Sequence, residues 1–290
     1  RDVADVQIPA YAFPFELTLT DAGLDAAKIG QLREDGYTTI IRLPFKLTTT
    51  RHHANRILTD TIRPRLLLLT QGLEMLALEG TEEPFTAEML RESLETCTRS
   101  LLESDTGALE EWLVYRSSYE IGPTDPRPED ARWSRTTSFG TAVAVNIVDN
   151  APRPAVNTPL HVYFPTDDYC GYPLILHADW ALDPDRRHLA RSADFKAYNQ
   201  FVTKHLVNHL GAEVVPDLLD RFPGSVGLAE CLCPVDSMTG AGLDVGRLCR
   251  SVLDDVPFLP SGSGGALSPN AALLLPKAAD ASRFYRWTDY

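Results

Sequence analysis

Two adjacent arginines, Arg186 and Arg187, are the residues of this sequence best suited to chemistry. A guanidinium keeps its proton at physiological pH and presents its donors as a rigid fork, which suits a polyphosphate or a carboxylate. The pair follows a strand-like apolar run at 174–176 and precedes a predicted helix. The sequence therefore predicts a loop that presents two positive charges to an anion. In the structural alternative, one arginine pairs with Asp183 or Asp185 and the other is solvated.

The other side chains that commonly carry catalysis form no complete motif. His205 and His209 have the four-residue spacing of a metal pair, but no acid lies between them as in His-Glu-x-x-His, so a solvated helix face is expected. The pair Cys231 and Cys233 lacks the further ligands of a zinc site, and Cys170 is expected to be structural. Neither Gly-x-Ser-x-Gly nor a Walker phosphate loop occurs. No metal site is predicted.

Length and composition indicate a globular protein of one large or two small domains. The chain has 290 residues, of which 44% are hydrophobic and 23% charged, and no apolar run approaches the roughly 18 residues of a membrane span. A net charge of −13 disfavours a broad nucleic-acid interface. An odd count of five cysteines favours a reducing, cytoplasmic setting. Because the chain begins Arg-Asp-Val, without Met or a leader, we expect a fragment of a longer protein.

Hydrophobic periodicity predicts the elements that would position the arginines. In the first half of the chain we expect strands at 12–19 and 38–45 around a helix at 22–34, a polar helix-compatible stretch at 51–60, a β-hairpin at 65–79, an amphipathic helix at 86–103, a strand at 111–121 and a surface loop at 122–132.

In the second half, three closely spaced strands precede the helices. They are predicted at 141–148, 160–164 and 172–177 and favour an antiparallel meander, in which His161 and His177 occupy ordinary satisfied or rim positions. Helices are predicted at 192–210, ended by Gly211, at 214–221 and at 245–253, with a Ser/Gly turn or mobile loop at 260–265. The predicted fold class is α/β (α+β), with mixed, mainly antiparallel sheets covered by helices.

Several of these segments resemble the GHKL ATPases, in particular the sacsin-like and ninety-kilodalton heat-shock chaperone type. Residues 35–45, Asp-Gly-Tyr-Thr-Thr-Ile-Ile-Arg-Leu-Pro-Phe, resemble the last strand of the nucleotide-binding domain of that family. Residues 64–78 are similar to the hairpin that opens the middle domain, and 172–189 to a middle-domain strand and loop ending in Arg-Arg-x-Leu. Residues 197–201 and 267–271 are similar to later sacsin-type segments.

The resemblance implies a particular division of the chain. Residues 1–60 would be the end of a GHKL nucleotide-binding domain, and residues 61–290 a middle or transducer domain. The asparagine helix that binds the metal, the Asp-x-Gly-x-Gly motif and the glycine-rich lid of that family are absent from this sequence, and would precede residue 1.

The resemblance also implies a site and its partners. Arg186 or Arg187 would contact the γ-phosphate of ATP, while Thr38 or Thr39 would lie on the nucleotide side. ATP and Mg²⁺ would be cofactors of the longer protein, and this chain alone would bind neither tightly and would be inactive. The implied partners are the amino-terminal nucleotide-binding segment, a second copy or a larger assembly, and a client protein.

Two other functions fit the same residues. The first is a non-catalytic interaction scaffold that uses its acidic surface as a partner site. The second is the transducer part of a DNA-processing GHKL ATPase of the gyrase or mismatch-repair branch, against which the acidity of the chain argues.

Overall fold

A computed structural model describes most of the chain beyond residue 61. The described residues are 62–78, 84–105, 107–128, 136–156, 158–234, 238–261 and 265–272, with seven separate helical residues between 27 and 59. The chain divides into two compact units, Arg1–Ala54 and Asn55–Tyr290. The four separate residues between 27 and 34 are helical, as predicted for 22–34, and those at 52, 56 and 59 are helical as well.

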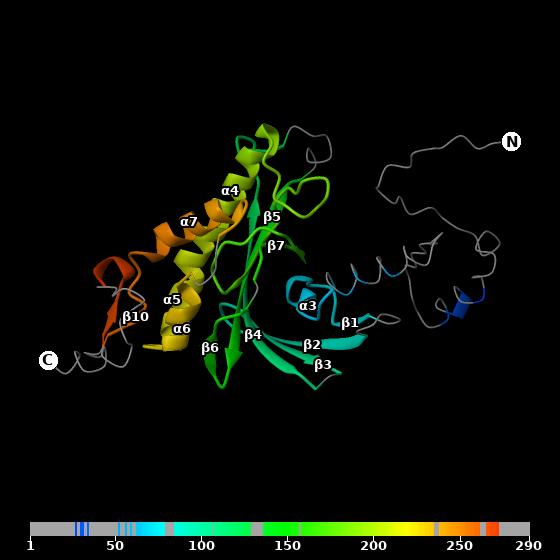
Figure 1. Cartoon of the computed structure of the whole chain (residues 1–290), viewed down its shortest axis with the longest axis horizontal. Helices are drawn as coiled ribbons and strands as arrows, with labels where there is room; N and C mark the ends of the chain where they lie inside the picture. The colour runs from blue at the N-terminus through cyan, green and yellow to red at the C-terminus, as the bar shows by residue number, and fades with distance from the viewer. Residues whose placement is uncertain are drawn as a thin grey trace. The chain divides into compact units, whose positions relative to one another are not determined.

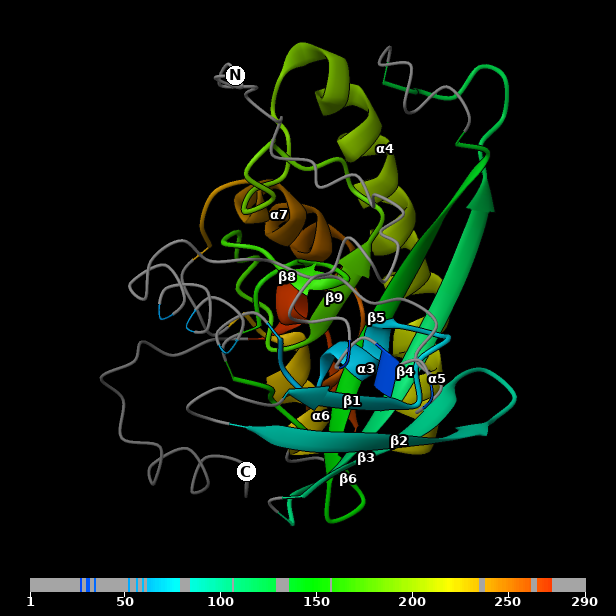
Figure 2. The same ribbon diagram turned by 90° about the vertical axis from the view of Figure 1, so that its right-hand side faces the viewer.

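The second unit is built on one large sheet, which Figures 1 and 2 show from two directions. Its strand order is β1-β2-β3-β4-β5-β9-β7-β8, with β6 paired to β5. The pairings are antiparallel except that of β7 with β9, which is parallel. The strands are β1 (Met75–Leu78), β2 (Phe85–Ser93), β3 (Thr98–Ser104), β4 (Leu109–Glu120), β5 (Ser138–Val148), β6 (Ala151–Arg153), β7 (His161–Val162), β8 (Phe164–Pro165) and β9 (Ile175–Ala178).

The central strands β4 and β5 are buried on both faces in their middle parts, because buried residues there occupy consecutive positions. In β4, Leu113 and Tyr115 point to one face, and Trp112 and Val114 point to the other. Both faces of such a strand need a cover, since successive side chains alternate sides. The strand predicted at 111–121 and the one predicted at 141–148 are therefore confirmed.

Helices cover the two faces unequally (Figure 1). The larger core joins one face to the carboxyl-terminal helices, and the smaller core joins the other face to the single turn α3. The helices are α3 (Leu66–Leu69), α4 (Ala193–His209), the π-helical turn η2 (Leu210–Val214), α5 (Val215–Arg221), α6 (Val226–Leu232), α7 (Gly242–Leu253) and the short 3₁₀ turn η3 (Pro269–Ala271). The predicted α+β class, with a mainly antiparallel sheet covered by helices, is thus confirmed.

The amphipathic helix predicted at 86–103 is wrong. This segment forms the hairpin β2–β3, closed where Leu94 N–H donates to the Cys97 carbonyl at 2.8 Å. Ala87 and Met89 alternate into the smaller core, while Leu90 remains 64% exposed. The apolar residues of this stretch fit a helical and a strand period equally well, and pairing with β4 decides between them.

The hairpin predicted at 65–79 is also wrong. Its first half is the helical turn α3, which begins at Leu66, and only its second half is a strand, β1. Pro64 has no N–H to donate to a strand partner, while its carbonyl accepts from Leu67 N–H at 3.0 Å, and the leucines at 67, 68 and 69 are all buried. A run of four leucines has no alternation that could distinguish a strand from a buried helix.

Two further predictions fail in detail. Gly211 does not end the helix predicted at 192–210, because η2 carries the chain on into α5. A Cβ at Gly211 would lie 2.2 Å from Cγ1 of Val252, so this glycine permits close packing against α7. The meander is wrong as well: β9 lies between β5 and β7, and the chain from 160 to 165 bends at Tyr163, whose φ is 59°.

The remaining helices agree with their predictions, and one was missed. The helices predicted at 192–210, 214–221 and 245–253 correspond to α4, α5 and α7. The sequence did not predict α6, which Ser225 caps by accepting a hydrogen bond from Leu228 N–H at 3.2 Å. The short strands β10 (Leu259–Pro260) and β11 (Ala266–Leu267) flank the predicted Ser/Gly turn. No helix in the described ranges has the length and apolar character to cross a bilayer.

Candidate functional site

The loop that carries the two arginines is a tight reversal after β9. Its ends meet in an antiparallel bridge between Leu182 and Leu189. Inside that bridge, Asp183 N–H donates to the His188 carbonyl at 2.9 Å, and Arg186 N–H donates to the Asp183 carbonyl at 2.8 Å. The backbone of Arg186 has a φ of 58°, which places this residue at the tip of the turn. The backbone therefore fixes where the arginine pair projects.

A buried carboxylate, Asp168, anchors the base of this loop. Its side chain is fully buried and accepts hydrogen bonds from Leu189 N–H at 2.8 Å and from Ala241 N–H at 3.0 Å. His188 Nδ1 lies 3.4 Å from the same carboxylate. A Cβ at Gly240 would lie 1.8 Å from Asp168 Oδ1, so only glycine fits there. The contacts join the loop to the chain that leads into α7.

The two arginines have different surroundings. Arg187 Nη2 lies 2.5 Å from Asp167 Oδ2, and both side chains are substantially exposed, at 68% and 45%. The main-chain N–H of Arg187, not its guanidinium, donates to Asp185 at 3.0 Å. Arg186 is exposed, and within the described ranges it makes no ion pair or side-chain hydrogen bond. Arg186 is therefore the member of the pair whose charge is available to an anion.

The predicted site also has a nucleotide side. Thr38 and Thr39 lie outside the described residues. Their contact with a nucleotide stays a prediction.

The predicted solvated face of His205 and His209 is wrong. His209 is only 5% exposed, its Nδ1 lies 3.3 Å from Thr141 Oγ1, and burial lowers its pKa. The His205 ring lies 3.9 Å, between centroids, from the Tyr119 ring, and burial lowers its pKa too. Both histidines pack α4 against the sheet. Among the described residues, no three possible metal ligands come together.

The cysteines are free and mostly buried. Burial raises the pKa of the Cys170 thiol to about 11 and that of Cys231 to about 12. Since the thiolate is the nucleophile, such thiols are inert at neutral pH. The five free cysteines are Cys97, Cys170, Cys231, Cys233 and Cys249.

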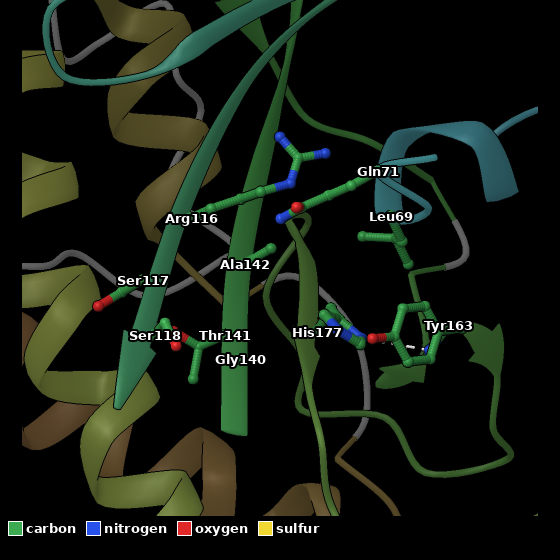
Figure 3. A pocket seen from close by; sticks show the side chains of 10 residues that line it. All are labelled: Leu69, Gln71, Arg116, Ser117, Ser118, Gly140, Thr141, Ala142, Tyr163 and His177. Carbon is green, nitrogen blue, oxygen red and sulfur yellow. Dashed lines mark hydrogen bonds between the residues drawn. The ribbon is translucent and has the colours of Figure 1, made fainter. Parts of the chain in front are cut away.

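A cavity of about 430 Å³ opens on the α3 side of the sheet (Figure 3). Its polar lining includes Gln71, just after α3, Arg116 and Ser118 on β4, and Tyr163 and His177. In Figure 3 the Arg116 guanidinium extends toward Gln71, and His177 and Tyr163 lie across the cavity. Arg116 was not among the predicted site residues. An arginine directly after the apolar run 112–115 of β4 was the signal that could have identified it.

His177 is held firmly at the wall of this cavity. It is 5% exposed, and its Nδ1 lies 3.2 Å from Tyr163 N and 3.1 Å from the His161 carbonyl. Burial lowers its pKa, against the opposing effect of Asp179, whose Oδ1 lies 3.8 Å from Nε2. Asp179 also accepts a hydrogen bond from Gly140 N–H at 2.7 Å. The predicted satisfied position of His177 is confirmed, with the addition that its ring faces a cavity.

Comparisons with protein-family models, with curated proteins and with solved structures each gave no match. The resemblance to GHKL ATPases thus rests on the residues quoted for it, and the family stays a prediction.

Proposed function

We propose that this chain is the transducer portion of a chaperone-like GHKL ATPase, in which Arg186 contacts the γ-phosphate and couples the nucleotide state to a conformational change. One observation carries the proposal: the anchored loop after β9 presents a guanidinium that has no carboxylate partner in the described part of the chain. An exposed, positioned arginine of this kind fits a phosphate group.

The role proposed for Arg186 is electrostatic stabilisation of negative charge. When bound, ATP with Mg²⁺ supplies a terminal phosphoryl group whose transfer to water spreads negative charge over its oxygens and the leaving oxygen. A guanidinium held beside those oxygens offsets that charge without moving a proton. The proposal assigns ATP and Mg²⁺ to the nucleotide-binding lobe, with Thr38 or Thr39 on its side.

Arg187 has a supporting role in this proposal. The Arg187 side chain forms an ion pair with Asp167, and the Arg187 carbonyl accepts a hydrogen bond from Asp167 N–H at 2.7 Å. These two contacts hold the second half of the loop. The pair with Asp167 offsets part of the charge of Arg187, so Arg186 is assigned the phosphate contact. Arg187 is assigned the positioning of the loop and a contribution to the local positive field.

The proposed setting is a homodimer or larger assembly in the cytoplasm that acts on a client protein. Five free cysteines are compatible with a reducing compartment. The net charge of −13 favours a protein client over nucleic acid.

The test is ATP turnover by the intact protein that contains residues 1–290. Replacing both Arg186 and Arg187 by alanine should lower turnover by about 10³-fold, the size of effect that arginine fingers have. Arg247→Ala, which removes an exposed arginine from α7, is the matched control and should leave turnover unchanged. Equal turnover in the double variant and the control, or no turnover by the intact protein, would overturn the proposal in favour of the scaffold.

A further inference from the structure

A second pair of arginines lies beneath α3, at a distance in sequence from the loop pair. Arg91, on β2, donates from Nη2 to the carbonyls of Leu67, Thr70 and Leu73 at 2.8, 2.9 and 2.9 Å. Arg116, on β4, donates from Nη2 to the Leu68 carbonyl. Carbonyls at the end of a helix have no partner within the helix, so these arginines satisfy the carboxyl end of α3.

The charge of this second pair is not neutralised. Neither Arg91 nor Arg116 has a carboxylate partner within the described ranges, and Arg91 Nε is buried without any hydrogen bond. Burial lowers the pKa of Arg116, and the nearby charge of Arg91 lowers it further. Two half-buried like charges are costly unless an anion compensates them, and the carbonyls of one helical turn offset only part of that cost.

Arg116 presents its guanidinium to the cavity described above. Figure 3 shows it extending from β4 toward the Gln71 side chain, and the Ser118 hydroxyl lines the same space. A guanidinium, an amide and a hydroxyl can all donate hydrogen bonds to an anion. The lining residues that the structure describes include no carboxylate. The carboxylate of Asp179 is engaged beside them: it accepts from Gly140 N–H at 2.7 Å, lies 3.8 Å from His177 Nε2 and hydrogen-bonds the Tyr163 side chain.

The remaining wall of the cavity suits the carbon skeleton of a small organic molecule. The Tyr163 ring lies 4.7 Å, between centroids, from the His177 ring, and Leu69 and Ala142 add apolar surface. A volume of about 430 Å³ is within the range of small-molecule sites. The positive φ of Tyr163 directs the chain through a conformation that tyrosine rarely adopts, which points to a constraint at this wall.

We propose that this cavity binds a small organic anion, whose carboxylate or phosphate group accepts hydrogen bonds from Arg116 and Gln71 while its body lies against Tyr163. This site is independent of the ATP contact assigned to Arg186. It uses different residues, on the sheet face that α3 covers, and it would exist in a scaffold as well as in an ATPase.

The test is calorimetric binding of two simple anions to the chain. Succinate represents carboxylates, glycerol 3-phosphate represents phosphate monoesters, and glycerol is the neutral control. We expect one or both anions to bind with a dissociation constant of about 1 mM or lower and glycerol not to bind. Binding of only succinate would identify a carboxylate ligand, and binding of only glycerol 3-phosphate would identify a phosphate ligand. Each of these results supports the site.

Variants then locate the binding. Arg116→Gln should abolish it, and Gln71→Ala and Ser118→Ala, which leave the α3 contacts in place, should each weaken it about fivefold. Arg99→Gln is the control, since Arg99 lies opposite Leu113 on the other face of the sheet and pairs with Glu111. If Arg116→Gln does not fold, the other two variants decide. No binding at about 10 mM anion, or binding that Gln71→Ala and Ser118→Ala leave unchanged, would overturn the proposal.

Discussion

The two arginine pairs of this protein differ in how they come together. Arg186 and Arg187 are neighbours in the sequence and lie exposed on a loop. Arg91 and Arg116 lie on different strands, β2 and β4, and become neighbours only because β3 pairs with both. Adjacent charges can be recognised from the sequence, while charges assembled by a sheet cannot. The difference also predicts that the loop pair can be removed without harm to the fold and the α3 pair cannot.

The largest expected effect is on folding, in the α3 pair. Arg91→Ala would leave the carbonyls of Leu67, Thr70 and Leu73 without their shared donor, and should lower the free energy of unfolding by about 3 kcal/mol. Arg186→Ala should change it by less than about 0.5 kcal/mol. Urea unfolding of the two variants measures the contrast, and equal stabilities would contradict it.

The second effect concerns the anchor of the loop. Asp168→Ala removes the acceptor of the Leu189 and Ala241 N–H groups and should cost about 2 kcal/mol. Amide hydrogen exchange should show faster exchange at Leu189, since the loop loses its anchor. Asp167→Ala is the neighbouring control and should leave the Leu189 amide protected. If both variants protected that amide equally, the loop would owe its shape to other contacts.

The third prediction concerns Arg221, an arginine that is paired with a carboxylate, that of Asp217. Asp217 accepts hydrogen bonds from Thr96 Oγ1 at 2.7 Å, Tyr115 OH at 2.6 Å and Arg221 Nε at 2.5 Å. Burial alone would raise its pKa, but these hydrogen bonds and the charge of Arg221 lower it below the usual range.

A lowered carboxyl pKa gives stability that is present above the unfolded value and lost as the pH falls through the folded one. Asp217→Asn should therefore destabilise the protein by about 1 to 2 kcal/mol at neutral pH. The difference from the wild type should shrink below about pH 4. Urea midpoints measured across this range test it, and a difference independent of pH would contradict it.

The smallest effect is expected at the ion pair of the loop. Because Arg187 and Asp167 are both well exposed, Asp167→Ala should change the unfolding free energy by less than about 0.5 kcal/mol. Thermal unfolding measures it. A larger loss would mean that the Arg187–Asp167 ion pair stabilises the fold and that the two arginine pairs differ little in their contribution to folding.

The sequence predicted the secondary structure best where the apolar residues followed a single periodicity, helical or strand-like. The long helix α4 and the strands β4 and β5 have repeats that only one structure can bury, and their predictions hold. The predictions failed at α3 and at the hairpin β2–β3, where the local pattern allowed a helix or a strand. Pairing of β3 with β4 decided the hairpin, and the burial of all three leucines at 67, 68 and 69 fits a helical turn at α3. The charged loop could be predicted since its arginines are adjacent.

The cavity beside α3 could not be predicted in the same way. Arg116, Gln71 and His177 come from three separate segments, and only the sheet order brings them to one space. Asp168 is a similar case. Its partners Leu189 and Ala241 are distant in sequence, and an aspartate in a polar turn gives no sign that it will be fully buried.

The most direct test of the account compares ATP and ADP binding to the intact protein. If Arg186 contacts the γ-phosphate, Arg186→Ala should weaken ATP binding about tenfold and leave ADP binding unchanged, because ADP lacks that group. Arg247→Ala should alter neither affinity. Equal affinities for ATP in the Arg186→Ala variant and the wild type, or an equal loss for ATP and ADP, would contradict the assignment of this arginine to the terminal phosphate.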